Sequence, residues 1–255
     1  MEPDRLRQRR AGGIAARSSR FPFAVPTLAV LAATFGGAAQ ARPVAPASVK
    51  PTQELAALLS AHQAFSKPRL DAAPVELVLQ RRPLTGERTV LPVLGKSAGP
   101  AGREWLHVRL PGRPNGHTGW IKRVKTRLST TPWHIVVDTA ERRVTVYRSG
   151  RVMRVVKAVV GKPSTPTPHG EFFVEELIAL RGGDVGAPFA LALSARSNVL
   201  QEFDGGPGQI GLHGLWNVGG VPGTAVSHGC VRLDTETIRW LVHRIVPGAP
   251  VTITG

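Results

Sequence analysis

From residue 74 onward, apolar positions fall into short alternating runs separated by glycine- and proline-rich turns, a pattern typical of β-strands. It predicts two successive β regions, one between residues 74 and 126 and one between residues 131 and 255. In the first region we expect strands at Val75–Leu79, Thr89–Leu94, Glu104–Leu110 and Thr118–Ile121. In the second we expect strands at His134–Asp138, Arg143–Arg148, Val152–Val160, Gly170–Glu175, Phe189–Ala195, Gln209–His213 and Pro250–Thr254. The predicted fold class is mainly β.

Two segments have helical spacing instead. Between Asp234 and Val246 the apolar residues lie on one helical face, Asp234 is a suitable N-cap, and a Pro-Gly pair follows. Thr52–Phe65 also has leucines at helical spacing, so a short helix is expected within a linker that covers residues 42–73. The sequence therefore predicts one late helix in the second region and a short helix before the first.

The first 41 residues have the order of a secretory signal peptide. A basic region rich in arginine is followed by an apolar run over residues 21–33 and by Ala39-Gln40-Ala41, a small-residue cleavage pattern. A retained N-terminal anchor is the alternative, although two prolines break the short apolar run. We therefore expect an extracytoplasmic protein of the periplasm or cell wall, with transient membrane contact only if the leader is retained.

The chain is strongly basic, with a formal net charge of +16 at pH 7. Such a surface attracts polyanions. Nucleic acid is excluded as a partner because the protein is expected to be exported and its arginines are scattered rather than arranged in a stripe. Anionic envelope polymers or lipid headgroups remain as partners. A basic surface that is only solvated and binds no polyanion is an alternative of equal weight.

The chain has one cysteine, Cys230, which cannot form an internal disulfide. It is therefore a buried residue without a chemical role, half of an intermolecular disulfide, or a reactive group. His228, Gly229 and Arg232 surround it in sequence, and this favours the reactive group, since nearby cationic and hydrogen-bonding groups stabilise a thiolate. The expected helix start at Asp234 favours the thiolate as well.

A cysteine nucleophile needs a base, and His213 and His228 are the two candidates. His213 ends an apolar strand, and the glycine-rich segment 216–223 allows the chain to fold back toward Cys230. A zinc site built from these three residues is the alternative, but their spacing fits no common zinc pattern. We therefore expect neither a metal nor another cofactor.

The segment Ile210-Gly211-Leu212-His213-Gly214, followed by Ser-His-Gly-Cys at residues 227–230, resembles the L,D-transpeptidase (YkuD) family. The resemblance covers residues 131–255 and includes Thr-Pro-Thr-Pro-His-Gly at residues 165–170. It implies a β-sandwich or mixed-sheet catalytic domain with one late helix.

The resemblance also implies a role for each matching residue. Cys230 would be the nucleophile and His213 its base, with the carbonyl of Gly214 orienting the imidazole. His228 would shape the acyl site, and the N–H groups of Gly229 and Cys230 would form the oxyanion hole. On the substrate side, roles are expected for three further residues, Ser227, Arg232 and Trp216. Ser227 would hydrogen-bond within the loop, and Arg232 would either order the loop or pair with a substrate carboxylate.

A second resemblance covers residues 74–126. Trp105–Leu110, a glycine-rich turn and Gly119-Trp120-Ile121 resemble bacterial SH3 domains, which implies a small SH3-like β-barrel. Such domains often bind cell-wall material. Core packing of Trp105 and Trp120 is the alternative.

Together the resemblances imply an acyltransferase that acts on peptidoglycan stem peptides through a thioester on Cys230. It would form 3→3 cross-links or anchor wall proteins. An L,D-carboxypeptidase, in which water accepts the acyl group, and a non-catalytic cell-wall-binding protein are the alternatives.

Overall fold

The computed structural model describes residues 49–203 and 205–255, all of which belong to one compact unit. The expected signal peptide and the first part of the expected linker lie outside the described residues. No helix in the described part of the chain is a candidate for crossing a membrane, because its α-helix, α1, has only eight residues.

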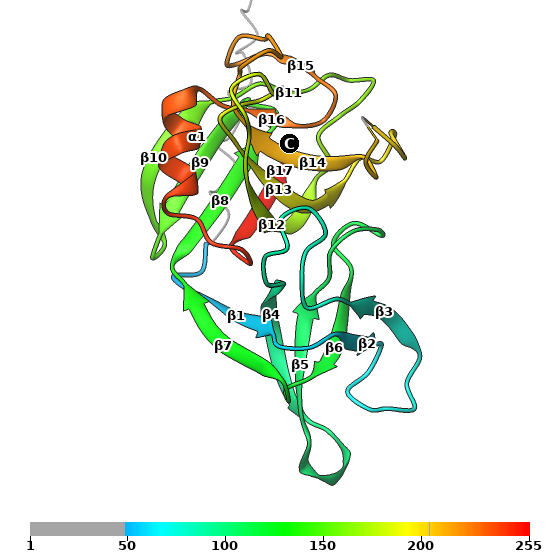
Figure 1. Cartoon of the computed structure of the whole chain (residues 1–255). Coiled ribbons are helices and arrows are strands. Elements are labelled where there is room, and N and C mark those ends of the chain that lie inside the picture. Colours follow the sequence, from blue (N-terminus) through cyan, green and yellow to red (C-terminus); the bar gives the residue numbers. More distant parts are fainter. Residues whose placement is uncertain (1–48, 204) are drawn as a thin grey trace, which may run out of the picture. The chain divides into compact units, whose positions relative to one another are not determined.

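The first sheet is seven-stranded, with the order β3-β2-β6-β5-β4-β1-β7 and antiparallel pairing throughout (Figure 1). Its strands are β1 (Gln53–Leu58), β2 (His62–Phe65), β3 (Pro74–Val78), β4 (Val90–Ala98), β5 (Glu104–Arg109), β6 (Thr118–Lys122) and β7 (Thr126–Thr131), with a 3₁₀ turn at Pro100–Gly102 before β5. The four strands expected from the sequence are confirmed as β3 to β6, and β4 continues past its expected end.

The expected helix over Thr52–Phe65 is wrong, because this segment forms β1 and β2. Leu55 and Leu58 are fully buried, and their spacing suits either a helix or an irregularly buried strand. The sheet decides the outcome, since β1 is hydrogen-bonded to β4 on one side and to β7 on the other. The expected linker over residues 42–73 therefore contributes two strands to the first sheet, which also extends through β7 to Thr131.

The second sheet is eight-stranded and mixed, with the order β10-β9-β8-β17-β12-β13-β14-β16. Its strands are β8 (Trp133–Asp138), β9 (Arg143–Arg148), β10 (Arg151–Lys157), β12 (Gly170–Ala179), β13 (Phe189–Arg196), β14 (Gln209–His213), β16 (Val231–Arg232) and β17 (Pro250–Thr254). Two of its pairings are parallel, β17 with β8 and β14 with β16. A separate parallel pair joins β11 (Val160–Gly161) to β15 (Ala225–Ser227). The expected strand Val152–Val160 is thus divided between β10 and β11.

The late helix is confirmed as α1 (Thr235–Val242). It buries Ile238 and Leu241 completely, in the same hydrophobic core as Leu233 and Ile245. The helix follows β16 directly, so its packing holds the strand that comes after Cys230 against the sheet.

A buried polar network joins the two sheets. Phe173 of β12 packs into the core of the first sheet, and the next two charged residues of β12, Glu175 and Glu176, are buried as well. Arg82, from the loop between β3 and β4, pairs with both carboxylates, and Arg196 donates to Glu175 Oε1 at 3.2 Å. Burial lowers the pKa of Arg196 to about 10, which leaves it charged at neutral pH. A paired network of this kind restricts how the two sheets pack together.

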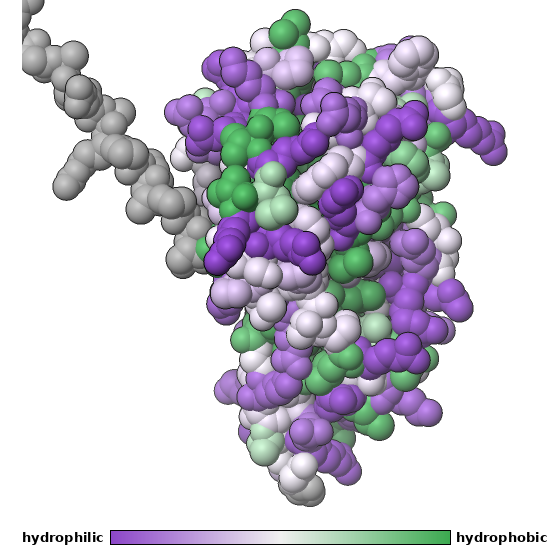
Figure 2. All heavy atoms as spheres, turned by 90° about the vertical axis from the view of Figure 1, so that its left-hand side faces the viewer, coloured by the Kyte–Doolittle hydropathy of each residue, from purple (hydrophilic) through white to green (hydrophobic). Residues whose placement is uncertain are grey.

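The face formed by β9, β10 and α1 is polar but not uniformly so. Arg143, Arg148 and Arg151 are exposed there, and Val152 and Met153 are exposed between them. Figure 2 shows this side of the molecule with hydrophilic and apolar side chains interspersed.

Asp234 caps α1, and its removal tests the contribution of the helix to stability. Its Oδ1 accepts from Thr237 N at 2.8 Å and its Oδ2 from Thr237 Oγ1 at 2.7 Å. Asp234→Ala should cost about 1 kcal/mol and lower the melting temperature by roughly 2–4 °C. Thermal unfolding followed by circular dichroism measures this shift. Asp234→Asn keeps an acceptor and should lose less, and an unchanged Tm in Asp234→Ala would contradict the cap.

Candidate active site

Parallel pairing of β14 with β16 brings the expected nucleophile and base together. Leu212 pairs with Val231 and His213 with Arg232, and Leu233 N donates to His213 O at 2.8 Å. Cys230 immediately precedes β16, so this register places it alongside β14. Figure 1 shows β16 next to β14. The segment between the two strands leaves the sheet and returns through β15.

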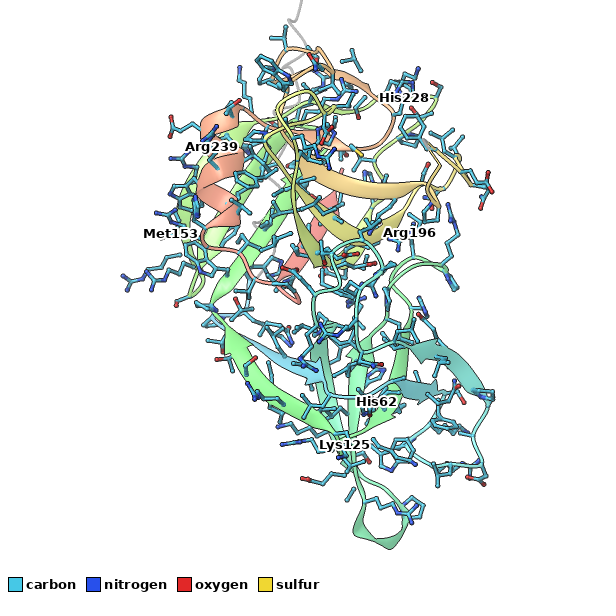
Figure 3. The ribbon with its side chains drawn as sticks, viewed as in Figure 1. His62, Lys125, Met153, Arg196, His228 and Arg239 are labelled. Carbon is cyan, nitrogen blue, oxygen red and sulfur yellow. The ribbon has the colours of Figure 1, made fainter. Side chains whose placement is uncertain are left out.

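A cavity of about 270 Å³ lies over this junction. Four of the expected site residues line it: Cys230, His213, His228 and Arg232. The remainder of its lining is mainly apolar, from Val185, Leu200, Phe203, Ile210 and Val218, with contributions from Ser197, Gly208 and Gln209. Figure 3 shows His228 on the loop that leads into β16.

The other expected site residues lie outside the cavity lining. Trp216 is 56% exposed, and Ser227 is fully buried within its own loop. Gly214 lies behind His213, where a Cβ atom would collide with Ala187 O.

The imidazole of His213 is oriented by the backbone. Its Nδ1 lies 2.8 Å from Gly214 O, and since a carbonyl can only accept, Nδ1 carries the proton. Nε2 is therefore left with a lone pair. Burial lowers the pKa of His213 below its ordinary value of 6.5, and the positive charge of Arg232 acts in the same direction, against the opposing effect of the Gly214 hydrogen bond. The ring is neutral at pH 7, as a general base requires.

The Cys230 thiol is oriented by β14, with Sγ 4.0 Å from Gln209 O. Burial raises the pKa of this thiol above its ordinary value of 9.0, and it outweighs the lowering effects of the Gly211 backbone and of Arg232. Arg232 lowers the pKa of the thiol, as expected from the sequence, but burial outweighs this effect. Desolvation by the apolar surroundings is the larger effect, so the resting pair is a neutral thiol and a neutral imidazole.

The turn before Cys230 is fixed by Ser227. Its Oγ accepts from Gly229 N at 3.1 Å and donates to Cys230 O at 2.6 Å, which is a hydrogen bond within the loop as expected. Gly229 has φ of +119°, and a Cβ atom there would lie 2.9 Å from Ile210 Cδ1, so glycine is required. Gly229 N–H already donates to Ser227 Oγ. Of the two expected oxyanion-hole donors, only Cys230 N–H is therefore not used within this turn.

Arg232 orders the segment that links β14 to β16. It is 9% exposed, and its Nη1 donates to Val218 O at 3.0 Å and to Gly219 O at 3.2 Å. This is one of its two expected roles. Its Nε is buried without a hydrogen-bond partner among the described residues.

Two threonines donate hydrogen bonds to backbone carbonyls of the turn before Cys230. Thr167 Oγ1 donates to Gly229 O at 2.8 Å, and Thr165 Oγ1 donates to Ser227 O at 3.2 Å. Both belong to the Thr-Pro-Thr-Pro segment, whose resemblance to the family was the only signal of its importance in the sequence.

Sequence reasoning missed the residues that surround the two histidines. Phe203 stacks on His228, with ring centroids 5.5 Å apart and an interplanar angle of 28°. Gly186, with φ of +83°, packs so closely on the His213 ring that a Cβ atom would collide with it. An isolated aromatic residue and a glycine in polar loops give almost no signal in a single sequence.

The family model of the YkuD L,D-transpeptidase catalytic domain matches residues 132–253. The putative L,D-transpeptidase YkuD of Bacillus subtilis is 33% identical over 124 residues, which are 49% of this chain and 67% of the relative. L,D-transpeptidase 1 of Mycobacterium tuberculosis is 29% identical over 128 residues, which are 47% of this chain and 49% of the relative.

The match to a solved L,D-transpeptidase structure from Mycobacterium smegmatis spans 65% of this chain and 99% of that structure's chain, at 20% identity and a TM-score of 0.37. The Bacillus relative, 33% identical and matched over 67% of its length, shows the family. The chain belongs to the L,D-transpeptidase (YkuD) family.

Proposed function

We propose that this protein is a cysteine-dependent L,D-transpeptidase that acts on peptidoglycan stem peptides, with Cys230 as nucleophile and His213 as base. One observation carries the proposal. The parallel pairing of β14 with β16 brings a neutral imidazole, held by Gly214 O, and the chain's single thiol to one cavity.

In the first step, Cys230 Sγ attacks the carbonyl carbon of the third residue of a stem tetrapeptide. His213 Nε2 takes the thiol proton, and the imidazolium that forms keeps its Nδ1–H bond to Gly214 O. Cys230 N–H stabilises the negative carbonyl oxygen, and Gly229 N–H joins it once its bond to Ser227 is exchanged. The C–N bond to the terminal D-alanine then breaks, His213 returns the proton to the leaving amine, and a thioester remains.

In the second step, an amine of a neighbouring stem attacks the thioester. His213 takes the proton of the amine, the C–S bond breaks, and the proton returns to Cys230 as the 3→3 cross-link leaves. The same thioester yields an anchored protein when the amine belongs to a wall protein, and a free tripeptide when water attacks. Neither step needs a metal or another cofactor.

The remaining expected residues are assigned to substrate positioning. Arg232 holds the linking segment through Nη1, and its positive charge is assigned to attract a substrate carboxylate to the cavity that it lines. Trp216, exposed on the same segment, is assigned to contact with the substrate outside the cavity. His228, stacked on Phe203, limits the cavity on the side of the nucleophile.

The proposed substrate places the protein outside the cytoplasm, because stem peptides are cross-linked there. We assign the first sheet to an SH3-like domain that contacts wall material. Export through residues 1–41 and attraction of the basic surface to anionic envelope polymers complete the proposal.

A carbapenem tests the nucleophile directly. Mass spectrometry of the intact wild type should show one covalent adduct, and Cys230→Ala should show none. His213→Ala should slow the acylation by about 10²–10⁴-fold, since it removes the base. His107→Ala, which changes a histidine of the first sheet that bonds to Thr118, is the matched control and should acylate normally.

The result that would contradict the proposal is a folded wild type without an adduct. Tetrapeptide supplied with and without an amine acceptor then separates the two enzymatic alternatives. A transpeptidase gives mainly the cross-linked product when the amine is present, whereas an L,D-carboxypeptidase gives the tripeptide in both cases.

The pH dependence tests the neutral pair. The pKa of His213 lies below 6.5, so the unprotonated ring is present above pH 6.5 and is lost only as the pH falls through the lowered pKa. The pKa of Cys230 lies above 9.0, so the thiol stays protonated up to that value. Carbapenem acylation should therefore be constant between pH 6.5 and pH 9.0 and fall only at lower pH.

Iodoacetamide reports the thiolate itself. Its reaction with Cys230 should rise steeply above pH 9.0. Fast alkylation that is constant from about pH 5 upward would show a preformed thiolate–imidazolium pair and would contradict the neutral pair.

A further inference from the structure

One wall of the cavity comes from the loop that connects β13 to β14, whose described residues are 197–203 and 205–208. Leu200 and Phe203 give the loop an apolar surface, and Ser197 and Gly208, at the two ends of the loop, also line the cavity. Phe203 stacks on His228, two residues from the nucleophile. The shape of this wall therefore decides which acyl donor can lie against Cys230.

Hydrogen bonds within the loop hold its base, its first turn and its tip. Ser197 N donates to Gly208 O at 2.8 Å, which closes the base of the loop. Ser197 Oγ accepts from Val199 N at 3.3 Å and from Leu200 N at 3.0 Å. These bonds fix the base and the first turn of the loop. At its tip, Phe203 N donates to Gly206 O at 2.9 Å and Gly206 N donates to Phe203 O at 3.0 Å. Support from outside the loop then acts on Ser197, Leu200 and Pro207.

Arg113 supplies that support from the first sheet. It lies in the loop between β5 and β6, and its guanidinium donates to three carbonyls of the wall. Nη2 donates to Ser197 O at 2.9 Å and to Leu200 O at 3.1 Å, while Nη1 donates to Pro207 O at 2.9 Å. One planar, always charged group thus ties the beginning, the middle and the end of the loop together, which a point charge such as lysine cannot reproduce.

Asn115, two residues along the same loop, fixes where the wall begins. Its Oδ1 accepts from Arg196 N at 2.8 Å and its Nδ2 donates to Arg196 O at 2.7 Å. The amide thereby pairs with both backbone groups of the last residue of β13. Its Nδ2 also donates to Asn198 Oδ1 at 3.0 Å, on the wall itself.

The residue that Asn115 holds is anchored in the buried network between the sheets. Arg196 donates to Glu175 Oε1 and, through Nη1, to Leu193 O at 2.9 Å and Ala195 O at 3.1 Å. Arg82 of the first sheet pairs with the same Glu175. Figure 3 shows Arg196 on the side of the second sheet that is turned toward the first. The loop of Arg113 therefore meets the wall at a rigid point.

We propose that Arg113 and Asn115 are positioning residues of the acyl-donor site, and that the first sheet thereby forms part of the active site. The proposal rests on the function proposed above, since it concerns the donor of the same reaction. The two residues hold the 197–208 wall in the shape that accepts a donor. They do not act on the thiol chemistry, because His213 and Cys230 are held by β14, β16 and Gly214.

The test compares two reagents that need the wall to different degrees. A carbapenem must lie against the wall to acylate Cys230, whereas iodoacetamide is small and reports only the thiol. Arg113→Ala should lower the second-order rate constant of carbapenem acylation about tenfold, mainly through a higher half-saturating concentration. Its rate with iodoacetamide should stay within about twofold of the wild type. Asn115→Ala should behave in the same way.

Arg88→Ala is the matched control. Arg88 also donates from a guanidinium to a carbonyl, Leu58 O at 2.8 Å, but within the first sheet and away from the cavity. This variant should acylate at the wild-type rate. Arg113→Lys keeps the charge without the planar fork, so its rate should lie between those of the wild type and Arg113→Ala.

Phe203→Ala provides an independent variant in which the arginine contacts are intact. It should show the same selective loss, and combining it with Arg113→Ala should add little, because both changes remove one wall. Equal carbapenem rates in the wild type and Arg113→Ala would overturn the inference alone. Parallel losses with both reagents would also overturn it, since they show general damage. A wild type that takes up no carbapenem would instead overturn the proposed function.

Discussion

Two backbone pairings between β14 and β16 determine the chemistry of this site. Parallel strands need a long connection, and here that connection leaves the sheet, pairs β15 with β11, and returns just before Cys230. A histidine at the end of one strand and a cysteine before the next are therefore neighbours by register rather than by the flexibility of a loop. The helix α1 holds β16 in place from the core, and the Thr-Pro-Thr-Pro segment supports the turn from outside.

The apolar surroundings of this pair determine its resting state. Burial moves the pKa of His213 down and that of Cys230 up, so both shifts favour the uncharged forms. In the proposed mechanism, charge develops only as the thiol attacks, next to a ring whose second nitrogen is already bonded to Gly214 O. The cavity wall that creates this environment is held in part by Arg113, so the first sheet influences the donor site without contributing to the proton transfer.

The sequence predicted those features that depend on local patterns. Strands β8, β9, β14 and β17 and the cap of α1 by Asp234 were predicted because alternation and capping are visible in neighbouring residues. The helix over Thr52–Phe65 was predicted wrongly because pairing with two distant strands overrides an ambiguous leucine spacing. The motif around Cys230 indicated which residues meet. The direction of its pKa shift, the stacking of Phe203 and the contacts of Arg113 depend on residues far away in sequence, which local patterns cannot show.

The central claim is that a neutral His213 with its proton on Nδ1 faces a protonated Cys230. Nitrogen-15 NMR of the protein with labelled histidine measures this most directly, because protonated and unprotonated ring nitrogens resonate at distinct frequencies. With His213 assigned by comparison with His213→Ala, the account predicts at pH 7 a neutral ring protonated at Nδ1 and unprotonated at Nε2. A doubly protonated ring, or a neutral ring with its proton on Nε2, would contradict it.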